Sequence, residues 1–123
     1  MPIQKILLVD DSKTELHHLS EVLGKRGFAV RTAENAEEAF RRLEEAKPDL
    51  ILMDVVMPET NGFQATRKIT KDPETSHIPV IMVSTKSQVT DRMWGMRQGA
   101  SEYLTKPVAE ADLVAAIQKV LAK

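Results

Sequence analysis

Residues 50–63 read LILMDVVMPETNGF, and this stretch decides the fold. It opens with Leu50 to Met53, an apolar run of strand length, and Asp54 stands at the tip of that run. A helix is predicted to begin at Gly62 and to stop at about Thr70, before Pro73. The stretch is therefore one strand-to-helix unit with an acidic residue at the junction.

The same unit recurs along the whole chain. Strands are predicted at Lys5 to Val9, Phe28 to Thr32, Leu50 to Met53, Val80 to Val83 and Tyr103 to Thr105. The other helices are predicted from after Ser12 to about Gly24, from Ala36 to Glu45, within Thr90 to Gln98, and from about Glu110 to Leu121. Because a single helix returns the chain to the same edge of the sheet, the strands must be parallel. We expect one α/β domain over residues 1–123, with no output domain.

The start of the first helix has its own signal. Ser12 and Glu15 have the spacing of a capping box, in which each side chain bonds the other residue's backbone N–H. Leu16, Leu19 and Leu23 then fall on one face, as an amphipathic helix requires.

Composition excludes several classes of function. The 123 residues are 42% hydrophobic, which is enough for one core, and the net charge of -1 gives no attraction to nucleic acid or to anionic membrane. Without cysteine there is no disulfide, zinc-thiolate site or thiol catalysis. The N-terminus, MPIQKILLVDD, is unlike a signal peptide, and no apolar segment has membrane-spanning length. We expect a cytoplasmic protein, by default a monomer.

The predicted strands end in polar residues that meet at one edge of the sheet. Parallel strands share their carboxyl ends, so side chains that follow four of the strands can converge. These residues are Asp10 and Asp11, Asp54, Ser84 and Thr85, and Thr105 and Lys106.

Crowded carboxylates repel one another unless a hard cation neutralises them, and Mg²⁺ prefers oxygen ligands. Asp54 could then present an oxygen to phosphorus while the cation withdraws charge from the transferring group. Lys106 supplies a charge for one phosphoryl oxygen, and the Ser84 hydroxyl can donate to another. The pattern predicts a metal-assisted phosphoryl site with Asp54 as the nucleophile.

Each of these residues also has an ordinary structural interpretation. Asp10 or Asp11 could cap the first helix, Asp54 could be a loop residue, and Lys106 could be solvated. The combination favours the functional reading, because chance rarely places two acids, a third acid, a hydroxyl and a Lys-Pro pair at one edge. Trp94 could either pack against the sheet or serve as an exposed anchor for a partner. The methionines are interpreted as core fillers and loop anchors, and the histidines receive no chemical role.

These motifs resemble those of the response-regulator receiver family. The matching segments are ILLVDDS at 6–12, LILMDVVMPETNGF at 50–63, IPVIMVST at 78–85 and YLTKP at 103–107. The resemblance covers nearly the whole chain and implies a flavodoxin-like, doubly wound sheet with strand order 2-1-3-4-5. More narrowly, the chain is similar to small single-domain regulators of the chemotaxis-like system that controls type IV pilus twitching motility.

The resemblance implies specific roles. Asp54 is the phosphoacceptor, Asp11 a direct Mg²⁺ ligand, Asp10 a water-mediated ligand, and the backbone carbonyl of Val56 a further ligand, with Mn²⁺ able to replace Mg²⁺. Lys106 contacts the phosphoryl group. The donor is a histidine kinase or its phosphotransfer domain, the downstream protein target is unspecified, and the protein is a signalling switch rather than an enzyme.

In this family a hydroxyl and an aromatic residue change position together on phosphorylation, and they correspond to Ser84 and Tyr103. The implied output surface is the fourth helix, the fifth strand and the fifth helix. A cis peptide bond before Pro107 is also compatible with the resemblance. Val56 and Lys86 occupy positions that tune hydrolysis in the family, and neither is suited to positioning water, so we expect modest autodephosphorylation.

Three other functions compete with this interpretation on the sequence alone. A phosphohydrolase with an aspartate nucleophile would need a general acid beside Asp54 and a cap over the substrate, and the chain supplies neither. A phosphorylation-independent interaction module of the same fold would be expected to have lost pocket residues. A phosphate sink for another regulator would keep the pocket and lack an output target.

Overall fold

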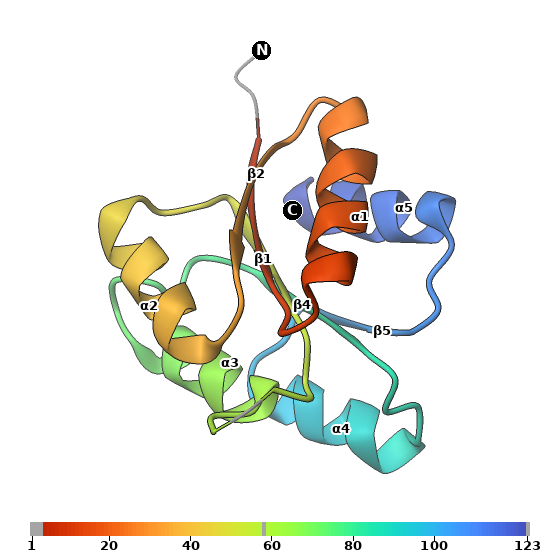
Figure 1. The fold of residues 1–123 in the computed structure, drawn as a ribbon. Coiled ribbons are helices and arrows are strands. Elements are labelled where there is room, and N and C mark those ends of the chain that lie inside the picture. Colours follow the sequence, from red (N-terminus) through yellow and green to blue (C-terminus); the bar gives the residue numbers. More distant parts are fainter. Residues whose placement is uncertain (1–3, 58, 123) are drawn as a thin grey trace.

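The computed structural model describes residues 4–57 and 59–122, which form a five-stranded parallel sheet in the order β2-β1-β3-β4-β5 (Figure 1). The strands are β1 (Lys5–Val9), β2 (Ala29–Ala33), β3 (Leu50–Met53), β4 (Val80–Ser84) and β5 (Glu102–Thr105). The helices are α1 (Lys13–Lys25), α2 (Ala36–Glu45), α3 (Gly62–Lys71), α4 (Val89–Arg97) and α5 (Glu110–Leu121). This is the α/β architecture and the strand order that the sequence predicted.

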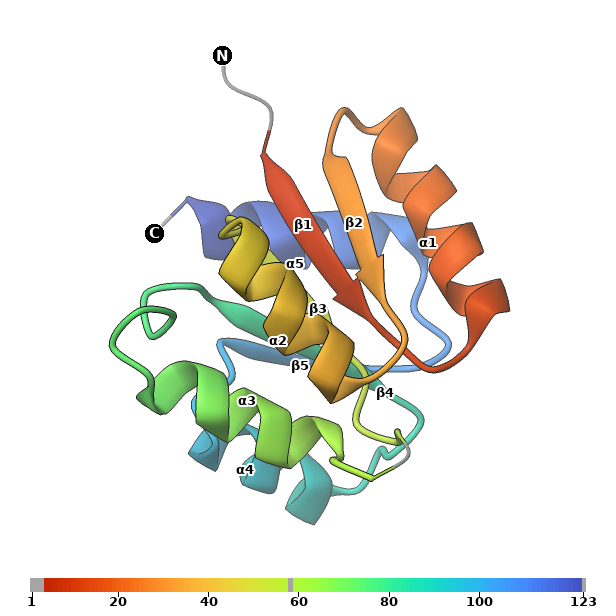
Figure 2. The same ribbon diagram turned by 60° about the vertical axis from the view of Figure 1, so that its left-hand side comes forward.

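Helices cover both faces of the sheet, with α1 and α5 on one side and α2, α3 and α4 on the other (Figures 1 and 2). Successive strand residues point to opposite faces, so each strand contributes to two cores. Ile6, Leu8, Leu50 and Leu52 pack with α1 and α5, and Leu7, Val9, Ile51 and Met53 pack with α2 and α3. The central strands are buried on both faces, which explains their continuous apolar runs.

Several predicted boundaries are off by one or two residues. β2 begins at Ala29 instead of Phe28, because the Phe28 N–H donates to Leu23 O and so closes the end of α1. β4 extends to Ser84, and β5 begins at Glu102 because that residue pairs with Ile81. The helix α4 begins and ends one residue earlier than predicted, and α3 continues to Lys71, which directly precedes its C-cap, Asp72.

The interpretation of Met53, Met57, Met82, Met93 and Met96 as core fillers and loop anchors is wrong for the two methionines on α4. Met53 and Met82 are fully buried, but Met93, Trp94 and Met96 are all more than two-fifths exposed on α4. Trp94 therefore does not pack into the sheet, and its role as an anchor for a partner stays a prediction. This helix has an apolar outer surface, which is unusual for a helix beside solvent.

The described residues include no helix with both the length and the hydrophobicity to cross a membrane. The three histidines, His17, His18 and His77, are exposed. The peptide bond between Lys106 and Pro107 is cis.

Candidate functional site

The backbone holds the candidate residues at the carboxyl edge of the sheet by extending its hydrogen-bond ladder beyond the strands. The N–H of Asp10 donates to Ala33 O at 3.1 Å, and that of Asp54 donates to Val9 O at 2.9 Å. The N–H of Lys106 donates to Ser84 O at 2.8 Å in the same way. These residues are therefore positioned by the rigid sheet and not by flexible loops.

Three carboxylates meet at this edge. Each of Asp10, Asp11 and Asp54 offers an oxygen, and these oxygens all lie within 4.8 Å of one another. Asp10 and Asp54 are buried, whereas Asp11 is exposed. A set of oxygen donors that carries this much negative charge fits a hard divalent cation such as Mg²⁺, which is bound through carboxylates and waters.

The protonation of Asp54 reflects this crowding. Burial, followed by the charge of Asp10, raises the pKa of Asp54 from its ordinary value of 3.8 to about 6, although Lys106 opposes the rise. A cation at the cluster would favour the ionised form and reverse the effect. The positive charge of Lys106 therefore does not offset the rise in the pKa of Asp54 that burial and Asp10 cause.

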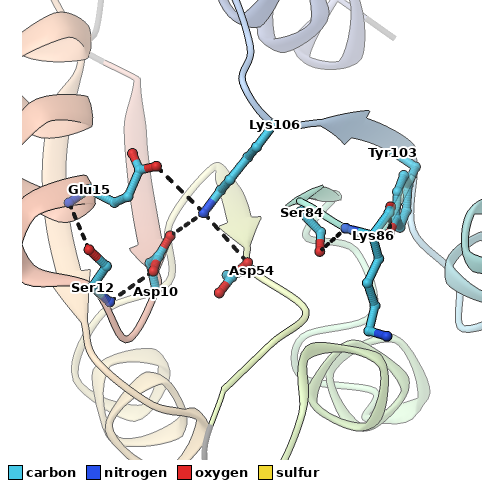
Figure 3. Close-up of polar contacts among 8 residues, drawn as sticks. All are labelled: Asp10, Ser12, Glu15, Asp54, Ser84, Lys86, Tyr103 and Lys106. Atoms are coloured by element: carbon cyan, nitrogen blue, oxygen red, sulfur yellow. Dashed lines mark hydrogen bonds and ion pairs between the residues drawn. The ribbon is translucent and has the colours of Figure 1, made fainter. Parts of the chain in front are cut away.

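Lys106 reaches across the carboxylates (Figure 3). Its Nζ lies 2.8 Å from Asp10 Oδ2, 3.6 Å from Asp54 Oδ1 and 3.9 Å from Glu15 Oε1. Burial would lower the pKa of Lys106, but the hydrogen bond to Asp10 and the charges of Asp54 and Glu15 together raise it. The ammonium is therefore present at neutral pH, where it can pair with an oxyanion beside Asp54.

The sequence profile described as "Response regulator receiver domain" matches residues 6–118. The chain belongs to the response regulator receiver family. Receiver domains bind Mg²⁺ at an acidic pocket and accept a phosphoryl group from histidine kinases, and this chain has an acidic cluster of Asp10, Asp11 and Asp54.

Individual proteins that resemble this chain in sequence or structure support the assignment to the receiver family. The chain is 56% identical over 118 residues to protein PilH of Pseudomonas aeruginosa, a match that covers 96% of this chain and 98% of PilH. It is 29% identical to the chemotaxis protein CheY4 of Vibrio cholerae, with a TM-score of 0.91 over 97% of this chain and 99% of that one. The BeF3-activated DrrB receiver domain superposes with a TM-score of 0.89 at 27% identity, over 99% of this chain and 100% of that one. The resemblance stated from the sequence is confirmed, including its narrower form.

Ser84 and Tyr103 of the receiver are linked through one intervening residue. The N–H of Lys86 donates to Ser84 Oγ at 3.1 Å, and the Tyr103 hydroxyl donates to Lys86 O at 2.7 Å (Figure 3). The Tyr103 ring is buried, which raises the pKa of its hydroxyl. Both ends of the Lys86 peptide segment are thus held by the two residues that the sequence singled out as a switch.

The capping box predicted for α1 forms only in part. The Glu15 N–H donates to Ser12 Oγ at 3.2 Å, as expected. The Ser12 N–H instead donates to Asp10 Oδ1 at 2.9 Å, and the Glu15 carboxylate turns toward Lys106. Asp10 therefore combines both of its sequence interpretations, because it supports the start of α1 and also belongs to the acidic cluster.

Two residues near the receiver pocket were not predicted from the sequence to belong to the site. Glu15 was assigned to capping alone, and only the fold reveals its approach to Lys106. Gly62 begins α3, where its N–H donates to Val55 O at 2.8 Å and where a Cβ would collide with the carbonyl oxygen of Asp54. The Asn-Gly pair in the opening motif was the available signal for this close approach.

The remaining candidates lie at the margin of the pocket. Val56 follows Asp54 closely in the loop after β3, and its side chain is half exposed. Thr85 and Lys86 are exposed in the loop after β4. The proposed ligand role of the Val56 carbonyl stays a prediction.

Proposed function

We propose that this receiver is a phosphorylation switch that accepts a phosphoryl group on Asp54 from a histidine kinase or its phosphotransfer domain, in a Mg²⁺-dependent reaction. The observation that carries the proposal is the placement of Asp54, which is buried, shares a carboxylate cluster and lies 3.6 Å from the Lys106 ammonium. A nucleophilic carboxylate beside a cation site and a fixed ammonium has the parts that phosphoryl transfer needs.

Each residue has a definite task in this reaction. An Asp54 oxygen forms the bond to phosphorus while the bond between phosphorus and the donor nitrogen breaks and the nitrogen keeps the electron pair. Asp10, Asp11, Asp54 and the Val56 carbonyl would hold the metal ion, for which Mn²⁺ could substitute. The bound cation would offset negative charge on the phosphoryl oxygens. Lys106 pairs with one phosphoryl oxygen, and the Ser84 hydroxyl donates to another.

The output follows from the link between Ser84 and Tyr103. When Ser84 turns toward a phosphoryl oxygen, its contact with the Lys86 N–H is lost, and the same loop carries the carbonyl that holds Tyr103. Two arrangements of this loop give a two-state element that phosphorylation biases. We assign the output surface to α4, β5 and α5, where α4 exposes Met93 and Trp94.

The biological setting is proposed from the relatives. Similarity to PilH over 98% of that protein's length supports a role in chemotaxis-like control of type IV pilus twitching motility. Histidine kinases of such systems phosphorylate their regulators in the cytoplasm, where we place this receiver. The Val56 side chain has no polar group with which to position water, which supports the expectation of modest autodephosphorylation.

The proposal is tested by intact-mass analysis after incubation with acetyl phosphate, with and without Mg²⁺. The wild type should gain one phosphoryl group only with Mg²⁺, and Asp54→Ala should gain none. Asp49→Ala is the matched control, because Asp49 is an exposed aspartate at the opposite end of β3 and should leave the gain intact.

The other possible results separate the alternatives. No gain with acetyl phosphate or with a phosphorylated histidine-kinase donor would favour a phosphorylation-independent interaction module. Phosphorylation without any change in affinity for proteins of the pilus system would favour a phosphate sink. Continued modification of Asp54→Ala would place the phosphoacceptor elsewhere.

A further inference from the structure

Helix α4 packs against the sheet at a glycine, Gly95, which lies next to Tyr103 and Met82. Every residue of α4 is described, and Gly95 is the one among them that is buried. A Cβ at position 95 would lie 2.8 Å from Cδ2 of Tyr103 and 3.0 Å from Sδ of Met82. Because real Cβ contacts are longer than this, α4 can approach Tyr103 so closely only without a side chain at position 95.

This glycine is not explained by backbone conformation. Gly95 lies inside a helix and does not have the positive φ that marks Gly27 and Gly99. Glycine is among the least favourable residues for a helix interior. Gly24 of α1, which also lies within a helix and does not begin it, is different because a Cβ there would meet nothing within 4 Å. Close packing against the Tyr103 ring therefore accounts for Gly95.

The Tyr103 ring is itself fixed from the opposite direction. It is 1% exposed, and its hydroxyl donates to the Lys86 carbonyl at 2.7 Å. The Lys86 N–H in turn donates to Ser84 at the end of β4. The ring thus spans the space between the loop beside the phosphorylation pocket and the underside of α4.

Helix α4 is attached to α3 just beyond its C-terminus, whereas its preceding turns carry exposed side chains. Beyond its C-terminus, the carbonyl of Gln98 accepts a hydrogen bond from Thr70 of α3 at 2.7 Å. The preceding turns carry the exposed side chains of Val89, Met93 and Trp94. A displacement of the Tyr103 ring would therefore tilt α4 about its attachment to α3 and move its apolar outer surface.

We propose that Gly95 is the positioning residue through which the buried Tyr103 ring seats α4, and that it thereby sets how α4 presents Met93 and Trp94 to a protein partner. The signalling consequence rests on the proposed function. The seating itself requires no phosphoryl group and can be tested without one.

The first test is a double-mutant cycle in urea unfolding. Gly95→Ala should increase the unfolding equilibrium constant by about 5- to 30-fold, because the added methyl group collides with the ring. Gly24→Ala is the matched control and should decrease that constant, because it brings the same gain in helix propensity without a collision. In a Tyr103→Val background, which removes Cδ2 and Cε2, Gly95→Ala should destabilise much less, because only the contact with Met82 Sδ remains.

Trp94 provides a second readout that a purely structural role would not move. It is the only tryptophan, it adjoins Gly95, and it is half exposed. Gly95→Ala should shift its emission relative to the wild type, and Gly24→Ala should not. In the Tyr103→Val background, Gly95→Ala should leave the emission as it is in Tyr103→Val alone.

Each contrary outcome overturns the proposal. If Gly95→Ala destabilises equally with and without the Tyr103 ring, the collision is with another group. If Gly95→Ala behaves like Gly24→Ala in stability and leaves Trp94 emission unchanged, Tyr103 does not seat α4. Should Gly95→Ala fail to fold, recovery of folding in the Gly95→Ala, Tyr103→Val double variant supports the proposal, and continued failure contradicts it.

Discussion

Replacing Asp54 by asparagine should stabilise the receiver at neutral pH in the absence of Mg²⁺. Burial and then the charge of Asp10 raise the pKa of Asp54 from 3.8 to about 6 in the folded chain. Because the folded chain binds this proton more tightly than the unfolded chain, stability is lost as the pH rises from below 3.8 through about 6. At about 1.4 kcal/mol for each tenfold change in affinity, the ionised carboxylate costs up to about 3 kcal/mol at neutral pH.

Asparagine keeps the shape of the side chain without its charge, so Asp54→Asn should recover most of that free energy. Urea unfolding without metal, measured across the pH range, should show the largest advantage of the variant at neutral pH and none below pH 3.8. Adding Mg²⁺ should narrow the difference, because a cation that binds the folded wild type stabilises it by mass action.

The control is Glu44→Gln, which makes the same chemical change at an exposed position of α2 and should alter the free energy of unfolding by no more than about 0.5 kcal/mol. A variant Asp54→Asn that is no more stable than the wild type at neutral pH would refute the reasoning. So would an advantage that does not change with pH, because a gain independent of titration could not come from relief of the carboxylate charge.

Two further changes test the surroundings of Asp54. Lys106→Met should slow phosphorylation by acetyl phosphate by about 100-fold. Calorimetry should find that the variant binds Mg²⁺ no more weakly than the wild type, because the ammonium competes with the cation for Asp10 and Asp54. Weaker Mg²⁺ binding would mean instead that Lys106 holds the three carboxylates in place. Tyr103→Phe should lower the free energy of unfolding by about 1 kcal/mol, because the 2.7 Å bond to the Lys86 carbonyl is lost. An unchanged urea midpoint would show that this bond adds nothing to stability.

The fold was predictable because its signals are local and repeated. Short apolar runs between helical patterns determine parallel pairing, and Pro48 and Pro73 mark places where helices cannot continue. Boundaries were less predictable where a tertiary contact decides them. Phe28 closes α1 through Leu23 instead of opening β2, and no periodicity in the sequence reveals that hydrogen bond.

The acidic cluster was predictable for a topological reason. Once the strands are parallel, residues that directly follow β1, β3 and β5 must share an edge, and this requires no knowledge of side-chain conformation. Glu15 was not predictable as a neighbour of Lys106, because its direction depends on the bond that Asp10 makes to the Ser12 N–H. The exposure of Met93 was also hidden, because a methionine side chain in a helix is normally buried.

Three positions depart from the local rules of folding. Asp54 is an acid in a buried, negatively charged setting, Glu59 in the following loop has a φ of 64°, and Gly95 interrupts a helix interior. Each lowers stability when taken alone, and proteins retain such residues mainly where function requires them. A sequence optimised only for folding would neutralise position 54, whereas alanine at position 95 would collide with the Tyr103 ring. Neutralising position 54 would also remove the charge that attracts a cation, so the stability lost at Asp54 is what allows the acidic cluster to respond to one.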